Sequence, residues 1–153
     1  MAKYNVPFRK TGGDSVRQLI ESICAAANPR RFKIYDLFVT NVAVTPADGP
    51  FTFTVKRVTG SATGTSVTPN AVDPGDTDPA ELLAEDLITA DHASFAAGTV
   101  VMRRAVNGRA ALRFSTVPGS ELIAAATASN GLSLGLIDVS TSQFDGDVNL
   151  DEL

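Results

Sequence analysis

The dipeptide Asn107-Gly108 is the sequence feature that most constrains the fold of this chain. Asn-Gly favours a two-residue type I′ turn, because both central residues of that turn have φ > 0, and the turn joins two antiparallel strands. The flanking segments, 99–106 and 109–116, are rich in apolar and β-branched residues, which is typical of strands. The sequence therefore predicts a β-hairpin centred on this turn.

The predicted hairpin has one largely apolar face, since its register places Val101 opposite Phe114. Its opposite face carries three guanidinium groups, from Arg104, Arg109 and Arg113. Arginine is favoured at interfaces because its planar group forms several directed hydrogen bonds. This arginine cluster is either a solvated sheet face or a contact surface for acidic groups of a partner or a neighbouring subunit.

Alternation of apolar and polar residues predicts further strands, because successive side chains of a strand point to opposite faces. Segments 51–56 and 32–39 show this pattern, and strands are also expected at 121–127, 132–139 and 148–150. The side chains expected to share a face are Phe51, Phe53 and Val55 in one strand, Phe32, Ile34, Asp36 and Phe38 in another, and Leu132, Leu134 and Leu136 in a third.

Two segments have helical features. In segment 15–27, apolar residues at helical spacing allow a helix, whereas the Asn28-Pro29 turn that follows suits a β-hairpin. A strand is favoured there because the rest of the chain has strand character. Segment 79–84 begins with proline followed by a glutamate, which predicts a short helix.

Taken together, these signals predict an all-β protein, an antiparallel β-sandwich or jelly roll of about seven or eight short strands with at most one short helix. A polar segment rich in proline, aspartate and glycine, 61–78, is expected to be one long loop. The 153 residues suffice for one domain. We expect an N-terminal arm at 1–14 and a single sandwich domain at 15–153.

Charge and composition argue against several classes of protein. The net charge is −4, which is the wrong sign for a nucleic-acid-binding protein. No segment approaches the ~20 consecutive apolar residues of a membrane-spanning helix. The first ten residues are charged and lead into no apolar stretch of a signal peptide, so we expect the chain to stay where it is made. Cys24 is the single cysteine, which excludes an intrachain disulfide.

One motif resembles a catalytic signature. Residues 131–135 read Gly-Leu-Ser-Leu-Gly, the pattern of a nucleophile elbow with Ser133 as the nucleophile. That elbow requires a strand-to-helix turn followed by an acid and a histidine, whereas Ser133 lies within an alternating strand and the only histidine, His92, precedes it. We expect no catalytic site.

Three aspartates in the long segment, Asp73, Asp76 and Asp78, form an acidic cluster that is either a calcium site or ordinary turn chemistry. Their spacing does not match the twelve-residue calcium loop, so turns are favoured. His92 has no second histidine to complete a transition-metal site and is expected in a surface loop. We expect no metal and no cofactor.

Several segments occur in an order that is shared with known proteins. They read KIYDL at 33–37 with Val39, TPNAVDPGD at 68–76, RF at 113–114, PGSEL at 118–122, and NGL at 130–132 with Leu134. The series resembles a family of tailed-bacteriophage virion structural proteins, among them small capsid decoration (cement) proteins built as β-sandwiches or jelly rolls. The resemblance runs across most of the chain, and it rests on strand and turn motifs, not on catalytic residues.

The resemblance implies a non-enzymatic protein that binds the major capsid protein on the outside of the shell as a homotrimer, is made in the host bacterial cytoplasm, and takes no small-molecule substrate. Alternatives are a tail or head-fibre protein, or a carbohydrate- or host-surface-binding module on the same fold. Sugar binding is disfavoured because the chain has no tryptophan and only two tyrosines to serve as platforms. The expected interaction surface comprises Pro7 and Arg9 of the arm, Pro69, Asn70 and Asp73 of the long loop, and the three arginines Arg104, Arg109 and Arg113.

Overall fold

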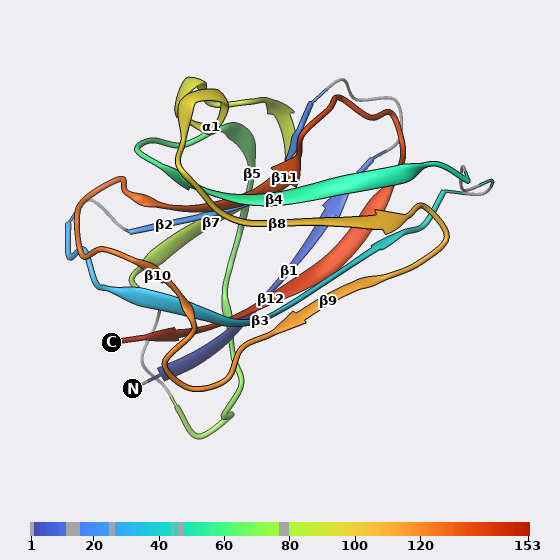
Figure 1. Cartoon of the computed structure of the whole chain (residues 1–153). Coiled ribbons are helices and arrows are strands. Elements are labelled where there is room, and N and C mark those ends of the chain that lie inside the picture. Colours follow the sequence, from blue (N-terminus) through green and yellow to red (C-terminus); the bar gives the residue numbers. More distant parts are fainter. Residues whose placement is uncertain (1, 12–15, 25–26, 44, 46–47, 77–79) are drawn as a thin grey trace.

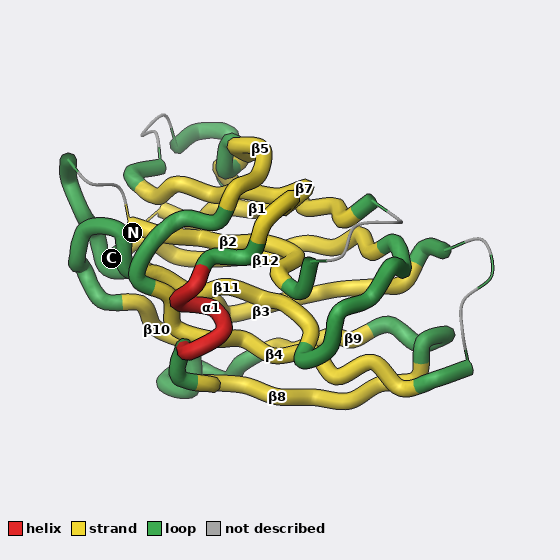
Figure 2. The backbone as a smooth tube through the Cα atoms, turned by 90° about the horizontal axis from the view of Figure 1, so that it is seen from above, coloured by secondary structure: helices red, strands yellow, loops and turns green. Residues whose placement is uncertain are grey.

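The chain forms two antiparallel β-sheets packed face to face, as the computed structural model of residues 2–11, 16–24, 27–43, 45, 48–76 and 80–153 shows (Figure 1; Figure 2). Sheet A has the order β10 (Leu122–Ala124), β3 (Phe32–Asn41), β12 (Phe144–Glu152), β1 (Ala2–Lys10), β6 (Asn70–Ala71), with β9 (Leu112–Ser115) also paired to β3. Sheet B has the order β5 (Thr63–Val67), β7 (Leu82–Ala90), β2 (Gln18–Cys24), β11 (Gly131–Leu136), β4 (Pro50–Val58), β8 (Val100–Asn107). The predicted all-β sandwich is confirmed, although the described residues form twelve strands where seven or eight were expected.

The core lies between the two sheets. Every residue of β11 is buried, and the predicted shared face of its three leucines is confirmed, because all three belong to the main hydrophobic cluster. Phe53 and Val55 of β4 belong to the same cluster, as predicted, and Phe51 packs against it. The Phe144 ring packs edge-on against Phe51 and Phe53 at centroid distances of 5.1 and 5.7 Å, which joins sheet A to sheet B.

Strand β3 changes its buried face halfway along, which the sequence pattern did not predict. Phe32 and Ile34 are buried, as expected, but beyond Tyr35 the buried residues are Leu37 and Val39 instead of Asp36 and Phe38. The register between β3 and β12 shifts at this point, because Asp36 pairs with Asn149 while Ile34 pairs with Leu150. The extra residue of this β-bulge turns Asp36 and Phe38 to the outer face of the sheet.

The predicted hairpin at Asn107-Gly108 is wrong in its pairing. The two flanking segments are strands, but β8 pairs with β4 in sheet B, and β9 pairs with β3 in sheet A. The predicted type I′ turn is wrong as well, because neither Asn107 nor Gly108 has a positive φ. Asn107 instead begins a turn that is shifted by one residue: its side chain accepts a hydrogen bond from the Arg109 N–H at 2.9 Å, and its carbonyl accepts one from the Ala110 N–H. The turn thus carries the chain from one sheet to the other.

The two segments with helical features are both strands. Segment 18–24 is β2, and its favoured interpretation as a strand is confirmed. The short helix predicted at 79–84 is wrong for its described part, because residues 82–90 form β7, whose Leu82 and Ala84 point into the core. A helix occurs instead at α1 (Ala93–Ala97), where the His92 ring nitrogen accepts a hydrogen bond from the Ser94 N–H at the first turn.

The predicted N-terminal arm is instead a strand inside the sandwich, as far as it is described. Residues 2–10 form β1, which pairs with β12 along nine residues, from Ala2 opposite Glu152 to Lys10 opposite Phe144. Burial of alternate side chains, Tyr4, Val6 and Phe8, accounts for this placement. The consequence is that β12, which contains the predicted strand at 148–150, lies between β1 and β3.

The segment expected to be one long loop, 61–78, contains two short strands. β5 forms an edge of sheet B by pairing with β7, and β6 forms an edge of sheet A by pairing with β1. Residues 77–78 lie outside the described residues. The predicted strand at 121–127 is reduced to the three residues of β10, and the one at 132–139 ends at Leu136.

Candidate functional site on the outer face of sheet A

The outer face of sheet A carries a row of polar side chains along β12. Asp145, Asp147, Asn149 and Asp151 alternate with buried residues such as Val148 and Leu150. Across the β1–β12 ladder these four side chains lie opposite Arg9, Pro7, Asn5 and Lys3, in that order. The period-two spacing of the acidic residues is visible in the sequence, whereas the central position of β12 in the sheet comes only from the structure.

In the middle of this face, hydrogen bonds connect four strands around Asp36. The Asn149 amide donates to the Asp36 carboxylate at 3.3 Å and itself accepts from the Asn5 amide at 3.0 Å. The Arg113 guanidinium and the Ser115 hydroxyl of β9 donate to the same carboxylate. Burial acts to raise the pKa of Asp36, but these hydrogen bonds and the Arg113 charge outweigh it and hold the pKa below its ordinary value.

At one end of the face, Lys33 lies between two carboxylates. Its ammonium is 3.2 Å from Glu121 and 3.5 Å from Asp151. The hydrogen bond to Glu121 raises the pKa of Lys33, against the opposing effect of desolvation. Lys3 extends over the Tyr35 ring, with its nitrogen 5.5 Å from the ring centroid. The side chains of this face are therefore held in place by one another.

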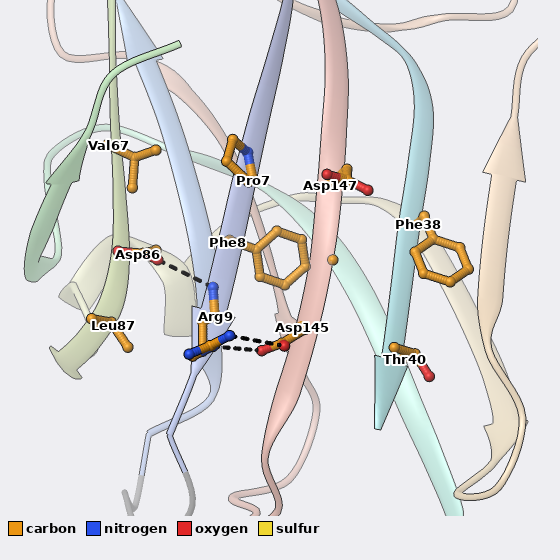
Figure 3. A pocket seen from close by; sticks show the side chains of 11 residues that line it. Pro7, Phe8, Arg9, Phe38, Thr40, Val67, Asp86, Leu87, Asp145 and Asp147 are labelled. Carbon is orange, nitrogen blue, oxygen red and sulfur yellow. Dashed lines mark hydrogen bonds and ion pairs between the residues drawn. The ribbon is translucent and has the colours of Figure 1, made fainter. Parts of the chain in front are cut away.

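At the other end lies a groove of about 560 Å³, where β1, β12 and β3 of sheet A meet β5 and β7 of sheet B (Figure 3). The Arg9 side chain binds Asp145 through two nitrogen–oxygen contacts of 3.0 and 3.4 Å, and the Arg9 backbone N–H donates to Asp86 at 3.1 Å. Burial raises the pKa of Asp86, although this hydrogen bond opposes the change. The other lining residues are Pro7, Phe8, Phe38, Thr40, Val67, Leu87, Gly146 and Asp147.

Leu87 has a backbone conformation that leucine rarely adopts, with φ of +46°. It lies in β7 where the pairing with β5 slips, since Thr63 pairs with Ala90 but Thr65 pairs with Asp86. Successive residues of a regular strand point to opposite faces, whereas Asp86 and Leu87 both line the groove. The irregular backbone thus adds an acidic and an apolar side chain to the same wall.

The structure brings some of the predicted interaction residues together. Pro7 and Arg9 line the groove. Asn70 and Asp73 lie further along β1: Asn70 pairs with Asn5, and Asp73 lines a second hollow of about 440 Å³ beside Lys3. Pro69 directly precedes β6 and is half-buried. Asp86, Leu87, Phe38, Asp145 and Asp147 were not predicted as part of the surface.

The three arginines do not form the predicted cluster, because the hairpin that would hold them does not exist. Arg104 is exposed on β8 of sheet B, where its side chain donates to the carbonyl of Arg103. Arg109 lies in the turn after β8 and pairs with Asp48. Arg113 lies on β9 of sheet A and pairs with Asp36.

The groups considered for chemistry have structural partners. Ser133 is fully buried, donates to the Ile20 carbonyl at 3.0 Å and accepts from Gln18 at 2.9 Å. Asp73 accepts the Gly75 N–H at 2.8 Å, as expected of a turn. Within the described residues no three His, Cys, Asp or Glu side chains converge as a metal site requires, and no described helix is long and apolar enough to cross a membrane.

The outer face of sheet B is covered around Gly135, Glu21 and Ser133. The Phe95 side chain of helix α1 packs on this face beside Gly135. It is so close that a Cβ atom at position 135 would clash with the Phe95 ring. Beneath the cover, Glu21 is 1% exposed and its carboxylate accepts from the Ala62 N–H at 2.9 Å and from the Gln18 amide at 3.0 Å. Burial, reinforced by the charge of Glu85, raises the pKa of Glu21 to about 7, against the opposing effect of these hydrogen bonds.

Comparison with known proteins gives no match: no family model fits this chain, and no curated protein or solved structure shows significant similarity to it.

Proposed function

We propose that this protein is a non-enzymatic structural component of a bacteriophage virion that decorates the capsid, binding the major capsid protein on the outer surface of the shell and stabilising it. Two arguments support the proposal: the ordered series of strand and turn motifs that resembles virion structural proteins, and the β-sandwich fold. The contact surface in this proposal is the outer face of sheet A, including the groove.

The outer face of sheet A is proposed as the contact surface because it is open to solvent and its side chains are already fixed in place. Its polar side chains are held by cross-strand contacts, such as those of Asp36 with Asn149 and of Arg9 with Asp145. Side chains that are already fixed lose less conformational entropy on binding, so such a face suits a rigid contact with a shell. Many copies, each favouring the assembled shell, would stabilise it by mass action.

Co-sedimentation with mature capsids that lack this protein tests the proposal. Saturable binding at a fixed number of copies per shell is expected. If the protein fails to bind shells and is instead present in purified tails or fibres, the decoration role is wrong and the tail or head-fibre alternative replaces it. Binding to glycans but not to shells would favour the host-surface module.

The homotrimer is part of the same proposal and has its own test. Sedimentation equilibrium of the purified protein at several concentrations is expected to give three times the chain mass of 16.0 kDa. A monomer at all concentrations, both free and bound to shells, would remove the trimer from the proposal.

A further inference from the structure

The groove beside Arg9 has the size and lining of a side-chain binding site. Its volume of about 560 Å³ lies in the usual range of ligand pockets. The walls are apolar on two sides, with Pro7 and Phe38 from sheet A and Val67 and Leu87 from sheet B (Figure 3). An occupant with an apolar stem would therefore bury that stem against both sheets.

The charges in the groove do not balance. Three carboxylates, of Asp86, Asp145 and Asp147, face a single guanidinium, that of Arg9. Arg9 is engaged by Asp145 through its side chain and by Asp86 through its backbone N–H. Asp147 receives one long hydrogen bond of 3.5 Å, from the Asn5 amide. The groove thus has a surplus of negative charge and a carboxylate with room for a cationic partner.

We infer that this groove is the docking site for an arginine side chain of the protein to which this chain binds, with the guanidinium at Asp147 and the stem between Phe38 and Leu87. A planar guanidinium donates to a carboxylate through two nitrogens and stacks on an aromatic ring, which an ammonium group does less well. The identification of that partner as the shell protein rests on the proposed function, whereas the groove's preference for arginine does not.

The inference is tested on the full-length protein, labelled with ¹⁵N and titrated with N-acetyl-arginine amide. The amide signals of Arg9, Leu87 and Asp147 are expected to shift saturably, and added salt is expected to weaken the effect. N-acetyl-citrulline amide has nearly the same shape without the charge and is expected to cause no saturable shift. Equal shifts with arginine and citrulline would overturn the inference, and a stronger response to N-acetyl-lysine amide would overturn the preference for arginine.

Two variants separate binding from folding. Asp147→Asn keeps the shape of the side chain and is expected to weaken arginine binding at least about fivefold, because a charge-assisted hydrogen bond is lost. Phe38→Leu keeps an apolar wall without the aromatic ring and is expected to weaken it less. Asp138→Asn, at an exposed carboxylate outside the groove, is the control and leaves binding unchanged. Unchanged binding in Asp147→Asn would contradict the assignment.

The same variants keep the two proposals distinguishable. If arginine amide binds in the groove but the protein does not bind shells, the groove stands and the decoration role fails. If shells bind wild type and Asp147→Asn equally and arginine amide does not bind, the docking inference fails and the decoration role stands.

Discussion

On the outer face of sheet B, Glu21 and Ser133 lie beneath a loop and a helix, whereas on the outer face of sheet A, Asp36 and Asp147 reach the solvent. A polar group under cover depends on partners within the protein, since an unpaired buried group costs about 1–3 kcal/mol. A polar group on an open face keeps water as an alternative partner. We therefore expect the buried polar residues of sheet B to stabilise the fold, and the exposed polar residues of sheet A to be available for binding a partner.

The largest expected difference between the two faces is in the free energy of unfolding that is lost when a phenylalanine on each face is replaced by alanine. Phe95→Ala on the face of sheet B removes a side chain with no exposed surface, together with the ring contacts of Arg17 and Lys56, and should destabilise the fold by about 4 kcal/mol. Phe38→Ala on the face of sheet A removes a half-buried ring and should cost about 1 kcal/mol. Urea unfolding of both variants measures the difference, and equal losses would contradict the contrast.

Glu21 makes the stability of the covered face depend on pH. Its pKa in the folded protein is about 7 against an ordinary 4.5, so the folded state binds more protons than the unfolded state between these values, and stability falls as the pH rises from about 4.5 to 7. The loss should reach about 3 kcal/mol. Glu21→Gln should remove the share of this slope that Glu21 contributes, making the variant more stable than wild type at pH 8 and about equal at pH 4.

Urea unfolding at several pH values measures that slope, with Asp138→Asn as the control that keeps it. A variant with the wild-type slope would show that Glu21 is not the group responsible.

Asp36 should show the opposite pH dependence on the open face. The pKa of Asp36 is lowered in the folded state. Its ionised carboxylate therefore stabilises the fold at pH values above the ordinary carboxyl pKa, and this stabilisation is lost as the pH falls through the lowered pKa. Asp36→Asn should cost about 1 kcal/mol near pH 7 and almost nothing near pH 2. Thermal unfolding at the two pH values checks this, and an equal cost at both would show that the charge of Asp36 does not matter.

The smallest effect on stability is expected for Arg9→Gln. The ion pair of Arg9 with Asp145 is largely exposed, with 59% of the arginine side-chain surface accessible, so its loss should change the free energy of unfolding by less than about 0.5 kcal/mol. Calorimetry would detect a larger change, which would mean that the groove stabilises the fold and is not simply an open surface.

Sequence patterns predicted those parts of the molecule whose structure is decided locally. The alternation in 51–56 predicted that Phe53 and Val55 lie in the core, and Asn107-Gly108 predicted that the strand ends in a turn there, although the turn is shifted by one residue and lacks the predicted positive φ. The partner of a strand is decided by the whole sandwich instead. Nothing in the residues around Asn107 indicates that β8 and β9 belong to different sheets.

The open face could not be predicted because it depends on two backbone irregularities. The bulge at Tyr35 turns Asp36 and Phe38 outward, and the conformation of Leu87 turns it to the same side as Asp86. A single inserted residue reverses every later side chain of a strand, so an alternating pattern read without the bulge assigns the wrong face. Pro7 and Arg9 were predicted as interaction residues of an N-terminal arm, whereas the structure places them in β1, where both line the groove.

The central claim is that the outer face of sheet A, and not that of sheet B, contacts the capsid shell. Co-sedimentation with shells that lack this protein tests it with one lysine substitution on each face: Asp147→Lys on the face of sheet A, and Leu83→Lys at a side chain 54% exposed on the face of sheet B. Wild type and Leu83→Lys are expected to bind saturably with the same number of copies per shell, and Asp147→Lys is expected not to bind. Full binding by Asp147→Lys, or loss of binding by Leu83→Lys alone, would contradict the claim.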